Sequence, residues 1–181
     1  MGLIAKIKEL FSAQTYIFKA MAEMDRQNTA YAAMTHEELL GLSDDELISA
    51  ALYRTDKKLA DLLGKKKKGT PAQWAEQLTE AQRVAFILSY FESDVQTGGL
   101  EYFIKRNNDL TPSVSSCLEA VGATEHQKLY DNWLADHGSD LNHSELLELQ
   151  DALTSFDQNY RALPAMEELL APYLRKHINE F

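Results

Sequence analysis

Residues 80–96 are apolar over more than one side of the helix that they are expected to form. A helix with so much apolar circumference is stable in water only when other elements surround it. The segment therefore predicts a buried central helix with the remaining elements packed around it. Its main apolar residues are Val84, Phe86, Ile87, Leu88, Tyr90 and Phe91.

The rest of the chain repeats the start and stop signals of helices. Thr35–Glu38 and Ser43–Glu46 have the spacing of capping boxes, and Thr70-Pro71 places an N-cap residue before a proline at the first helical position. Gly98-Gly99 is expected to end the central helix in a tight corner. Apolar periodicity between these signals predicts further helices at residues 43–63, 100–106, 111–122, 124–138, 144–161 and 164–179.

No run of alternating β-branched residues competes with these helices, so the expected fold is all-α. The length of 181 residues and the 45% share of hydrophobic residues fit one globular domain, residues 1–181. We expect a single-domain bundle of about seven to nine helices. Residues 43–181 would form its main body, and residues 1–42 would form a helical extension packed on it.

The first residues raise the question of a secretory segment. Lys6, Lys8 and Glu9 interrupt the apolar stretch before it reaches the length that such a segment needs. No stretch approaches the ~20 apolar residues of a membrane span, and Cys117 is the only cysteine, which excludes an internal disulfide. A soluble protein of the reducing cytoplasm is the expectation.

The segment Gly64–Thr70 approaches the spacing of a phosphate-binding loop. That motif needs a lysine directly after its second glycine, and Thr70 occupies this position. We therefore reject the motif. The charge run Lys65–Lys68 is expected to be a solvated loop between helices, with a small basic docking spot as the alternative.

Two other groups of residues could carry chemistry. His137, Asp140 and His143 could supply three metal ligands, but they lack His-Glu-x-x-His spacing and fall in a polar loop. Cys117 would be a nucleophile only if the fold brought a base such as His126 to it, and its surroundings favour a buried structural cysteine. The sequence thus predicts no catalytic residue, metal or cofactor, and not an enzyme. A catalytic site formed only in the folded bundle stays open.

Negative charge is concentrated in the last third of the chain. The net charge is −10, and residues 119–181 contain 12 acids against 4 bases, with no Lys or Arg between Lys128 and Arg161. Exposed helices usually mix both signs, because opposite charges one turn apart stabilise them. A solvated acidic surface would explain the pattern, and so would a site for a basic partner. The candidate partner-binding residues are Asp131, Asp136, Asp140, Glu145, Glu148, Asp151 and Asp157.

Three of these acids are spaced three residues apart. Glu145, Glu148 and Asp151 are expected to stack on neighbouring turns of the helix predicted at residues 144–161. Like charges on neighbouring turns cost a helix some stability. Such a surface disfavours nucleic acid and anionic membranes as partners and favours a basic protein.

Several segments resemble the DNA-mimic-protein domain family. Ser89–Phe103 resembles its helix followed by Asn-Gly-Gly-Phe and aromatic residues, and Cys117–Ala123 resembles its Leu-x-x-Ile-Gly-Ala segment. Ser155–Tyr160 and Tyr173–Phe181 resemble its closing helices. The resemblance spans about residues 70–181, and more weakly begins near Ser43. Three residues depart from the pattern: Thr97 replaces Asn, Leu100 replaces Phe and Tyr102 replaces Gln.

The resemblance implies an all-helical bundle without known catalytic residues. For some family members it also implies acidic binding to a DNA-binding protein in place of DNA. We therefore expect a non-enzymatic regulator that binds a protein with a basic surface, a transcription factor being one candidate. Direct binding of nucleic acid or of a membrane is not expected, and a homodimer is compatible with the sequence. The alternative is an immunity-type or scaffold protein that binds through shape and apolar contacts.

Overall fold

The computed structural model describes residues 23–64 and 68–181, and every regular element in these ranges is helical, which confirms the all-α prediction. Residues 23–33 are helical and precede eleven further elements in the described ranges. These are α2 (His36–Leu40), α3 (Asp44–Leu63), α4 (Pro71–Ala75), α5 (Glu80–Asn107), η1 (Asn108–Leu110), α6 (Thr111–Ala120), α7 (Thr124–His137), α8 (His143–Glu148), α9 (Gln150–Arg161), α10 (Met166–Lys176) and η2 (Ile178–Glu180).

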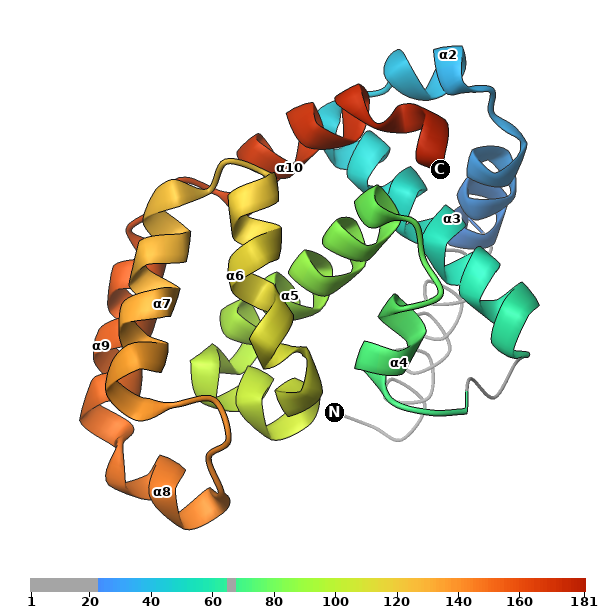
Figure 1. Ribbon diagram of the computed structural model, residues 1–181. Helices are drawn as coiled ribbons and strands as arrows, with labels where there is room; N and C mark the ends of the chain where they lie inside the picture. The colour runs from blue at the N-terminus through green and yellow to red at the C-terminus, as the bar shows by residue number, and fades with distance from the viewer. Residues whose placement is uncertain (1–22, 65–67) are drawn as a thin grey trace, which may run out of the picture.

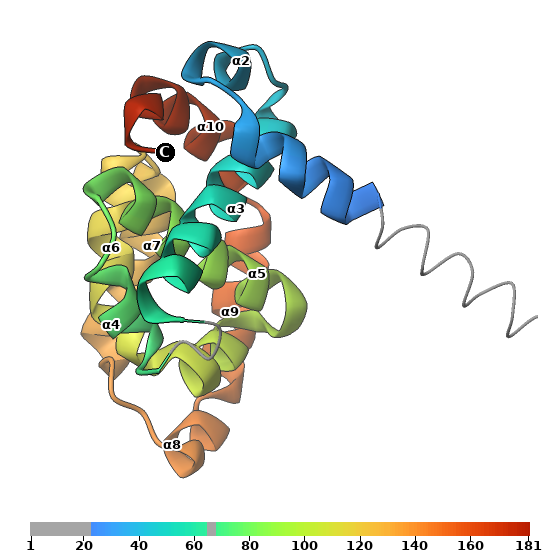
Figure 2. The same ribbon diagram turned by 90° about the vertical axis from the view of Figure 1, so that its right-hand side faces the viewer.

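Helix α5 runs through the middle of the bundle, as its apolar circumference predicts. It packs against α3, α4, α6, α9 and α10 (Figures 1 and 2). Ala85, Leu88, Phe91, Leu100 and Phe103 along its length are completely buried. Burial of these apolar side chains supplies the driving force for this arrangement, at roughly 25 cal/mol per Å² of apolar surface removed from water.

Aromatic rings join the middle of α5 to its last turns and to two C-terminal helices. The ring of Phe91 meets Phe103, Tyr130 and Tyr160 edge-on, with centroid distances of 5.0, 5.3 and 5.6 Å. Such pairs contribute about 0.5–1.5 kcal/mol each beyond their buried area. Because Tyr130 lies on α7 and Tyr160 on α9, this cluster fixes the α7–α9 hairpin to the central helix.

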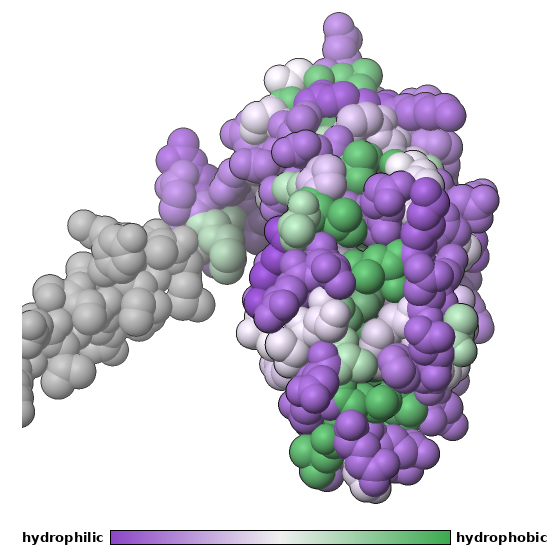
Figure 3. Space-filling view, turned by 90° about the vertical axis from the view of Figure 1, so that its left-hand side faces the viewer, coloured by the Kyte–Doolittle hydropathy of each residue, from purple (hydrophilic) through white to green (hydrophobic). Residues whose placement is uncertain are grey.

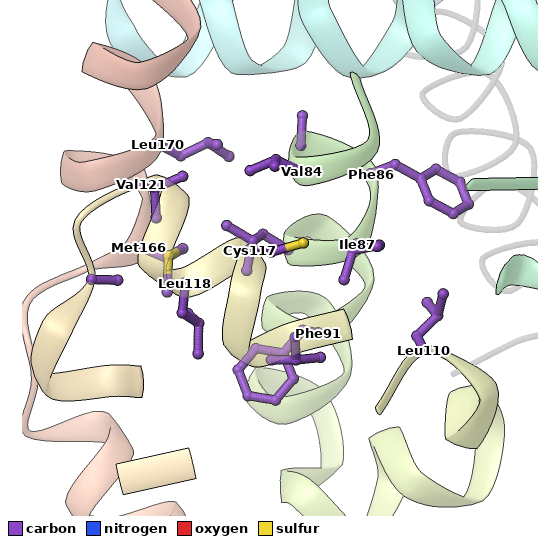
Figure 4. Close-up of a cluster of buried hydrophobic side chains, with 14 of the residues drawn as sticks. Val84, Phe86, Ile87, Phe91, Leu110, Cys117, Leu118, Val121, Met166 and Leu170 are labelled. Carbon is purple, nitrogen blue, oxygen red and sulfur yellow. The ribbon is translucent and has the colours of Figure 1, made fainter. Parts of the chain in front are cut away.

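A second part of the core lies where α5, α6 and the beginning of α10 meet (Figure 4). Val84 and Ile87 of α5 face Cys117 and Leu118 of α6, and Met166 closes the cluster from α10. Apolar side chains along α10 account for this contact, because Met166, Leu170 and Leu174 are all buried. The helix predicted at residues 164–179 is α10 followed by η2 in the structure.

Most predicted helix ends are confirmed. The capping boxes at Thr35 and Ser43 are both formed, and Thr70 caps α4 ahead of Pro71. Two further boxes were not predicted: Thr79 with Gln82 at the start of α5, and Asn142 with Glu145 at the start of α8.

The predicted corner at Gly98-Gly99 is also present. Gly99 has φ 79° and ψ −179°, a conformation almost restricted to glycine, and it separates the helical residues 80–98 from residues 100–107. Asp157 of α9 caps the second stretch, because its Oδ1 accepts the Leu100 N–H at 2.9 Å. Asp94 ties the stretches together by accepting from Arg106 Nη1 at 3.0 Å and from Asn107 Nδ2 at 2.6 Å.

One predicted helix is wrong. Residues 144–161 form two helices, α8 and α9, which meet at Leu149 with φ −99° and ψ 15°. The side chain of Gln150 donates through Nε2 to the carbonyl of Leu146 at 3.0 Å, and so takes the acceptor that a continuous helix would offer to the Gln150 backbone N–H. Glu145 and Glu148 therefore do not share a helix with Asp151.

The N-terminal extension is described from residue 23 onward. Its helix at residues 23–33 projects from the body (Figure 2), and Tyr31 is the buried residue in that stretch. Arg54 Nε of α3 donates to the Tyr31 carbonyl at 2.9 Å, which anchors the extension. Residues 1–22 of the predicted extension lie outside the described residues.

The corner supplies a test of the fold. Gly99→Ala should lower the free energy of unfolding by about 3 kcal/mol or more, because a Cβ there combines backbone strain with overlap of the Asp157 carboxylate. Gly138→Ala is the matched control: Gly138 has nearly the same backbone conformation, φ 82° and ψ 178°, but no atom within 4 Å of the added Cβ. Urea unfolding that shows equal losses for both variants would contradict the packing at the corner.

Candidate partner-binding surface

Five of the seven candidate acids gather at one end of the molecule. Residues 136–151 comprise the last residues of α7, the connecting loop, α8 and the first turn of α9, and they form the tip marked by α8 in Figures 1 and 2. We call this segment the acidic end. All five of its acids are exposed, and it contains no Lys or Arg; the acids are Asp136, Asp140, Glu145, Glu148 and Asp151.

The other two acids lie elsewhere. Asp131 is exposed further along α7, and its position around that helix differs from that of Asp136 by about 140°. Asp157 lies about 120° around α9 from Asp151 and faces α5, where its carboxylate caps the corner at Leu100. Burial raises the pKa of Asp157 above the ordinary range of aspartate. Asp157 is among the candidate partner-binding acids because it lies close to them in the sequence, but its carboxylate stabilises the fold.

Bases neutralise acids in other parts of the molecule but not at the acidic end. Lys57 pairs with Asp61 on α3, and Arg175 of α10 pairs with Asp44. Of the ion pairs between described residues, none includes an acid from residues 131–157. Hydrophilic residues cover most of the side on which α7 and α9 lie, divided by a narrow apolar stripe (Figure 3). The acidic end is therefore a negative surface without internal counter-charges in the described structure.

Local hydrogen bonds and helix N-termini explain why the bundle tolerates three of these acids. Glu145 Oε2 accepts the Asn142 N–H at 2.8 Å, and Asn142 Oδ1 accepts the Glu145 N–H at 3.2 Å. Asp151 lies in the first turn of α9, where the helix dipole favours negative charge. Asp140 Oδ1 accepts from Asn108 Nδ2 at 3.4 Å. Each of these carboxylates has a local stabilising role that offsets repulsion, while its remaining surface faces solvent.

An apolar residue lies among these charges. Leu147 of α8 is 55% exposed, between Leu146, which is buried, and Glu148. Its position follows from the turn of α8, which directs Leu146 into the core and its neighbour outward. Sequence reasoning missed it, because the predicted long helix gave no means of deciding which leucine faces solvent.

The three residues considered as metal ligands have separate surroundings. The His137 ring packs on Trp133 with centroids 5.2 Å apart, Asp140 bonds Asn108, and His143 begins α8 within electrostatic range of Glu101. Within residues 23–64 and 68–181, no group of three His, Cys, Asp or Glu side chains is arranged to hold a metal ion.

Cys117 and His126 are buried in different environments. The thiol of Cys117 points toward α5 (Figure 4), and burial raises its pKa to about 11, the reverse of what a nucleophilic cysteine needs. The ring of His126 packs against Tyr160 with centroids 5.2 Å apart, and burial lowers its pKa. Both residues are packing elements of the core.

The lysine run is described only at its end. Residues 65–67 lie outside the described residues, while Lys68 is exposed and its carbonyl accepts the Trp74 Nε1–H at 3.0 Å. In the part of the chain that the structure covers, no helix combines the length and the apolar character that crossing a membrane requires.

Comparison with known proteins places this helical, acidic domain among the DNA-mimic type. The model of the DMP19-like protein family matches residues 76–177, more than half of the chain. The chain therefore belongs to the DMP19-like family, which confirms the resemblance stated above over that segment. The match covers the central helix, the corner and the acidic end. Neither the curated proteins nor the solved structures gave a match.

The residues that depart from the family motif have definite places at the corner. Thr97 Oγ1 donates to the Ser93 carbonyl at 2.6 Å, and Leu100 is completely buried. Tyr102 accepts from Arg106 through its hydroxyl at 3.0 Å, with the guanidinium 4.9 Å from its ring centroid. The corner therefore keeps its geometry with these residues.

The buried histidine makes stability depend on pH. Since the folded-state pKa of His126 is lowered, the unfolded chain takes up its proton first as the pH falls below about 6.5. The stability that neutral His126 provides is present above that pH and is lost below it, at up to ~1.4 kcal/mol per pH unit. His126→Gln should flatten the dependence of the unfolding free energy on pH between about 7 and 5. Identical slopes for the parent protein and for His126→Gln would refute this role.

Proposed function

We propose that the protein is a non-enzymatic regulator whose acidic end binds the basic, DNA-contacting surface of another protein. Two observations support the proposal. The chain belongs to the DMP19-like family, and the match includes the whole acidic end. The five acids there are exposed, and none has a basic partner among the described residues. The second observation carries the proposal, because unpaired exposed carboxylates are what a basic surface recognises.

Electrostatics would act at two ranges in such a complex. At a distance, five negative charges within sixteen residues attract a basic surface and speed association. At contact, Lys and Arg side chains that otherwise meet phosphates would bond the carboxylates of Asp136, Glu148 and Asp151. Exposed Leu147 lies between these groups and would give the partner one apolar contact. Asp131 would be peripheral, and Asp157 would act on folding rather than on binding.

The functional test neutralises three acids for which no hydrogen bond from their carboxylates to a helix end is seen in the described structure. The triple variant Asp136→Asn, Glu148→Gln and Asp151→Asn should weaken binding of the captured partner at least about tenfold, as expected for loss of several charge contacts. Affinity capture from the native host lysate at low salt would supply the partner, and fluorescence anisotropy would measure affinity. Glu145 is left intact, because its carboxylate caps α8.

A second triple variant has the same net charge and serves as the control. Asp45→Asn, Glu119→Gln and Glu168→Gln remove three exposed acids from α3, α6 and α10, and should leave affinity within about twofold. Affinity should fall steeply with salt, and duplex DNA should compete for the partner. Binding that survives the first triple variant and high salt would instead favour the scaffold-type alternative, in which apolar contacts dominate.

A further inference from the structure

A cleft between α3, α5 and the start of α10 lies apart from the acidic end. Its volume is about 460 Å³, within the range of small-molecule sites. The three helices pack side by side (Figure 2). The apolar walls are aliphatic and include Ile48 and Leu52 from α3, Leu88 from α5, and Met166 and Leu170 from α10.

The cleft contains a fixed negative charge. Glu92 of α5 is half-buried in its lining; its Oε1 accepts from Gln96 Nε2 at 3.0 Å, and its Oε2 accepts from the hydroxyl of buried Tyr160. Both donors are neutral, so they orient the carboxylate without neutralising it. Glu167 adds a second carboxylate to the lining, and no Lys, Arg or His contributes to it among the described residues.

A neighbouring cleft provides a contrast. It shares Leu52, Ser89 and Ser93 with the first and also contains an acid, Asp94. There Arg106 pairs with Asp94 at 3.0 Å, whereas Glu92 has no cationic partner among the described residues. Partly buried carboxylates attract cations more strongly than exposed ones, because less water screens the interaction.

We propose that this cleft binds a small aliphatic cation, a hydrocarbon chain that ends in a primary ammonium or a guanidinium group. The N–H donors of the cation meet the free lone pairs of Glu92, and the chain lies against Leu52, Met166 and Leu170. Because the walls have no aromatic rings among the described residues, the cleft does not suit a quaternary ammonium, which lacks N–H donors and prefers aromatic cages.

The test uses 1-hexylamine, which is protonated at pH 7, as the probe. Titration of the full chain, followed by ¹⁵N–¹H spectra, should shift the amides of Ser89, Glu92 and Ser93 with a Kd on the order of 1 mM. Hexan-1-ol has the same chain without the charge, and tetramethylammonium has the charge without donors; both should bind at least about tenfold more weakly. Equal affinity of the alcohol would overturn the proposal, as would the absence of binding at about 20 mM amine.

Two variants assign the site. Glu92→Gln should weaken hexylamine binding at least about tenfold, and Glu119→Gln on α6 should not change it. If Glu92→Gln fails to fold, Ser93→Lys keeps Glu92 and its Tyr160 bond and places a competing ammonium at the exposed rim, with the same expected loss. Unchanged affinity in a folded Glu92→Gln or Ser93→Lys protein would refute the site.

A peptide probe distinguishes two natural sources of the cation, a basic side chain of a protein and a free amine. Acetyl-Leu-Lys-Leu-amide presents the same ammonium on a protein side chain. Tighter binding than hexylamine would assign the cleft to a basic side chain of a protein partner, and weaker binding would assign it to a free amine. Binding of these probes is measured without the partner of the acidic end, so failure here leaves the proposed function untouched.

Discussion

The structure depends on the burial of α5, whose residues 84–88 are buried one after another. A helix that is apolar around its circumference cannot lie on a surface, so its neighbours must enclose it. Phe91 shows how this works in detail, because its edge contacts reach Tyr130 of α7 and Tyr160 of α9. The same contacts that bury α5 therefore orient the hairpin that carries the acidic end. Tyr160 also donates to Glu92, so the aromatic cluster positions the carboxylate of the cleft as well.

The corner at Gly99 is the second constraint. It turns the chain so that Leu100 and Phe103 enter the core, and it brings the free N–H of Leu100 to Asp157. Asp157, an acid of the α7–α9 hairpin, therefore stabilises the fold and does not face solvent as the other acids do. Carboxylates that lie close in sequence thus divide into two kinds, those that cap helices or corners and those that face solvent. Glu145 belongs to both, since it completes a capping box while remaining exposed.

The acidic end shows how a protein can keep unpaired charges without losing its fold. Three of its acids lie in a loop or in the first turn of α8 or α9, where local hydrogen bonds and the helix dipole offset their repulsion, whereas Asp136 and Glu148 end α7 and α8 and face solvent. Stability is supplied elsewhere, by the core around α5 and by ion pairs such as Arg175 with Asp44. This separation leaves the negative surface available to a partner, in keeping with membership of the DMP19-like family.

Local signals in the sequence determined the helical class, the central position of residues 80–96, the corner at Gly98-Gly99, the burial of Cys117 and most helix starts. Capping and apolar periodicity act over a few residues, so they can be read along the chain. Tertiary structure decided the break at Leu149, the role of Asp157 and the exposure of Leu147. The role of Asp157 and the exposure of Leu147 depend on contacts between helices that are distant in sequence. The break at Leu149 depends on a hydrogen bond from the Gln150 side chain to the Leu146 carbonyl, which competes with the backbone bond of a continuous helix. The cleft at Glu92 likewise exists only because α3, α5 and α10, separated in sequence, pack together and leave one carboxylate without a cation among the described residues.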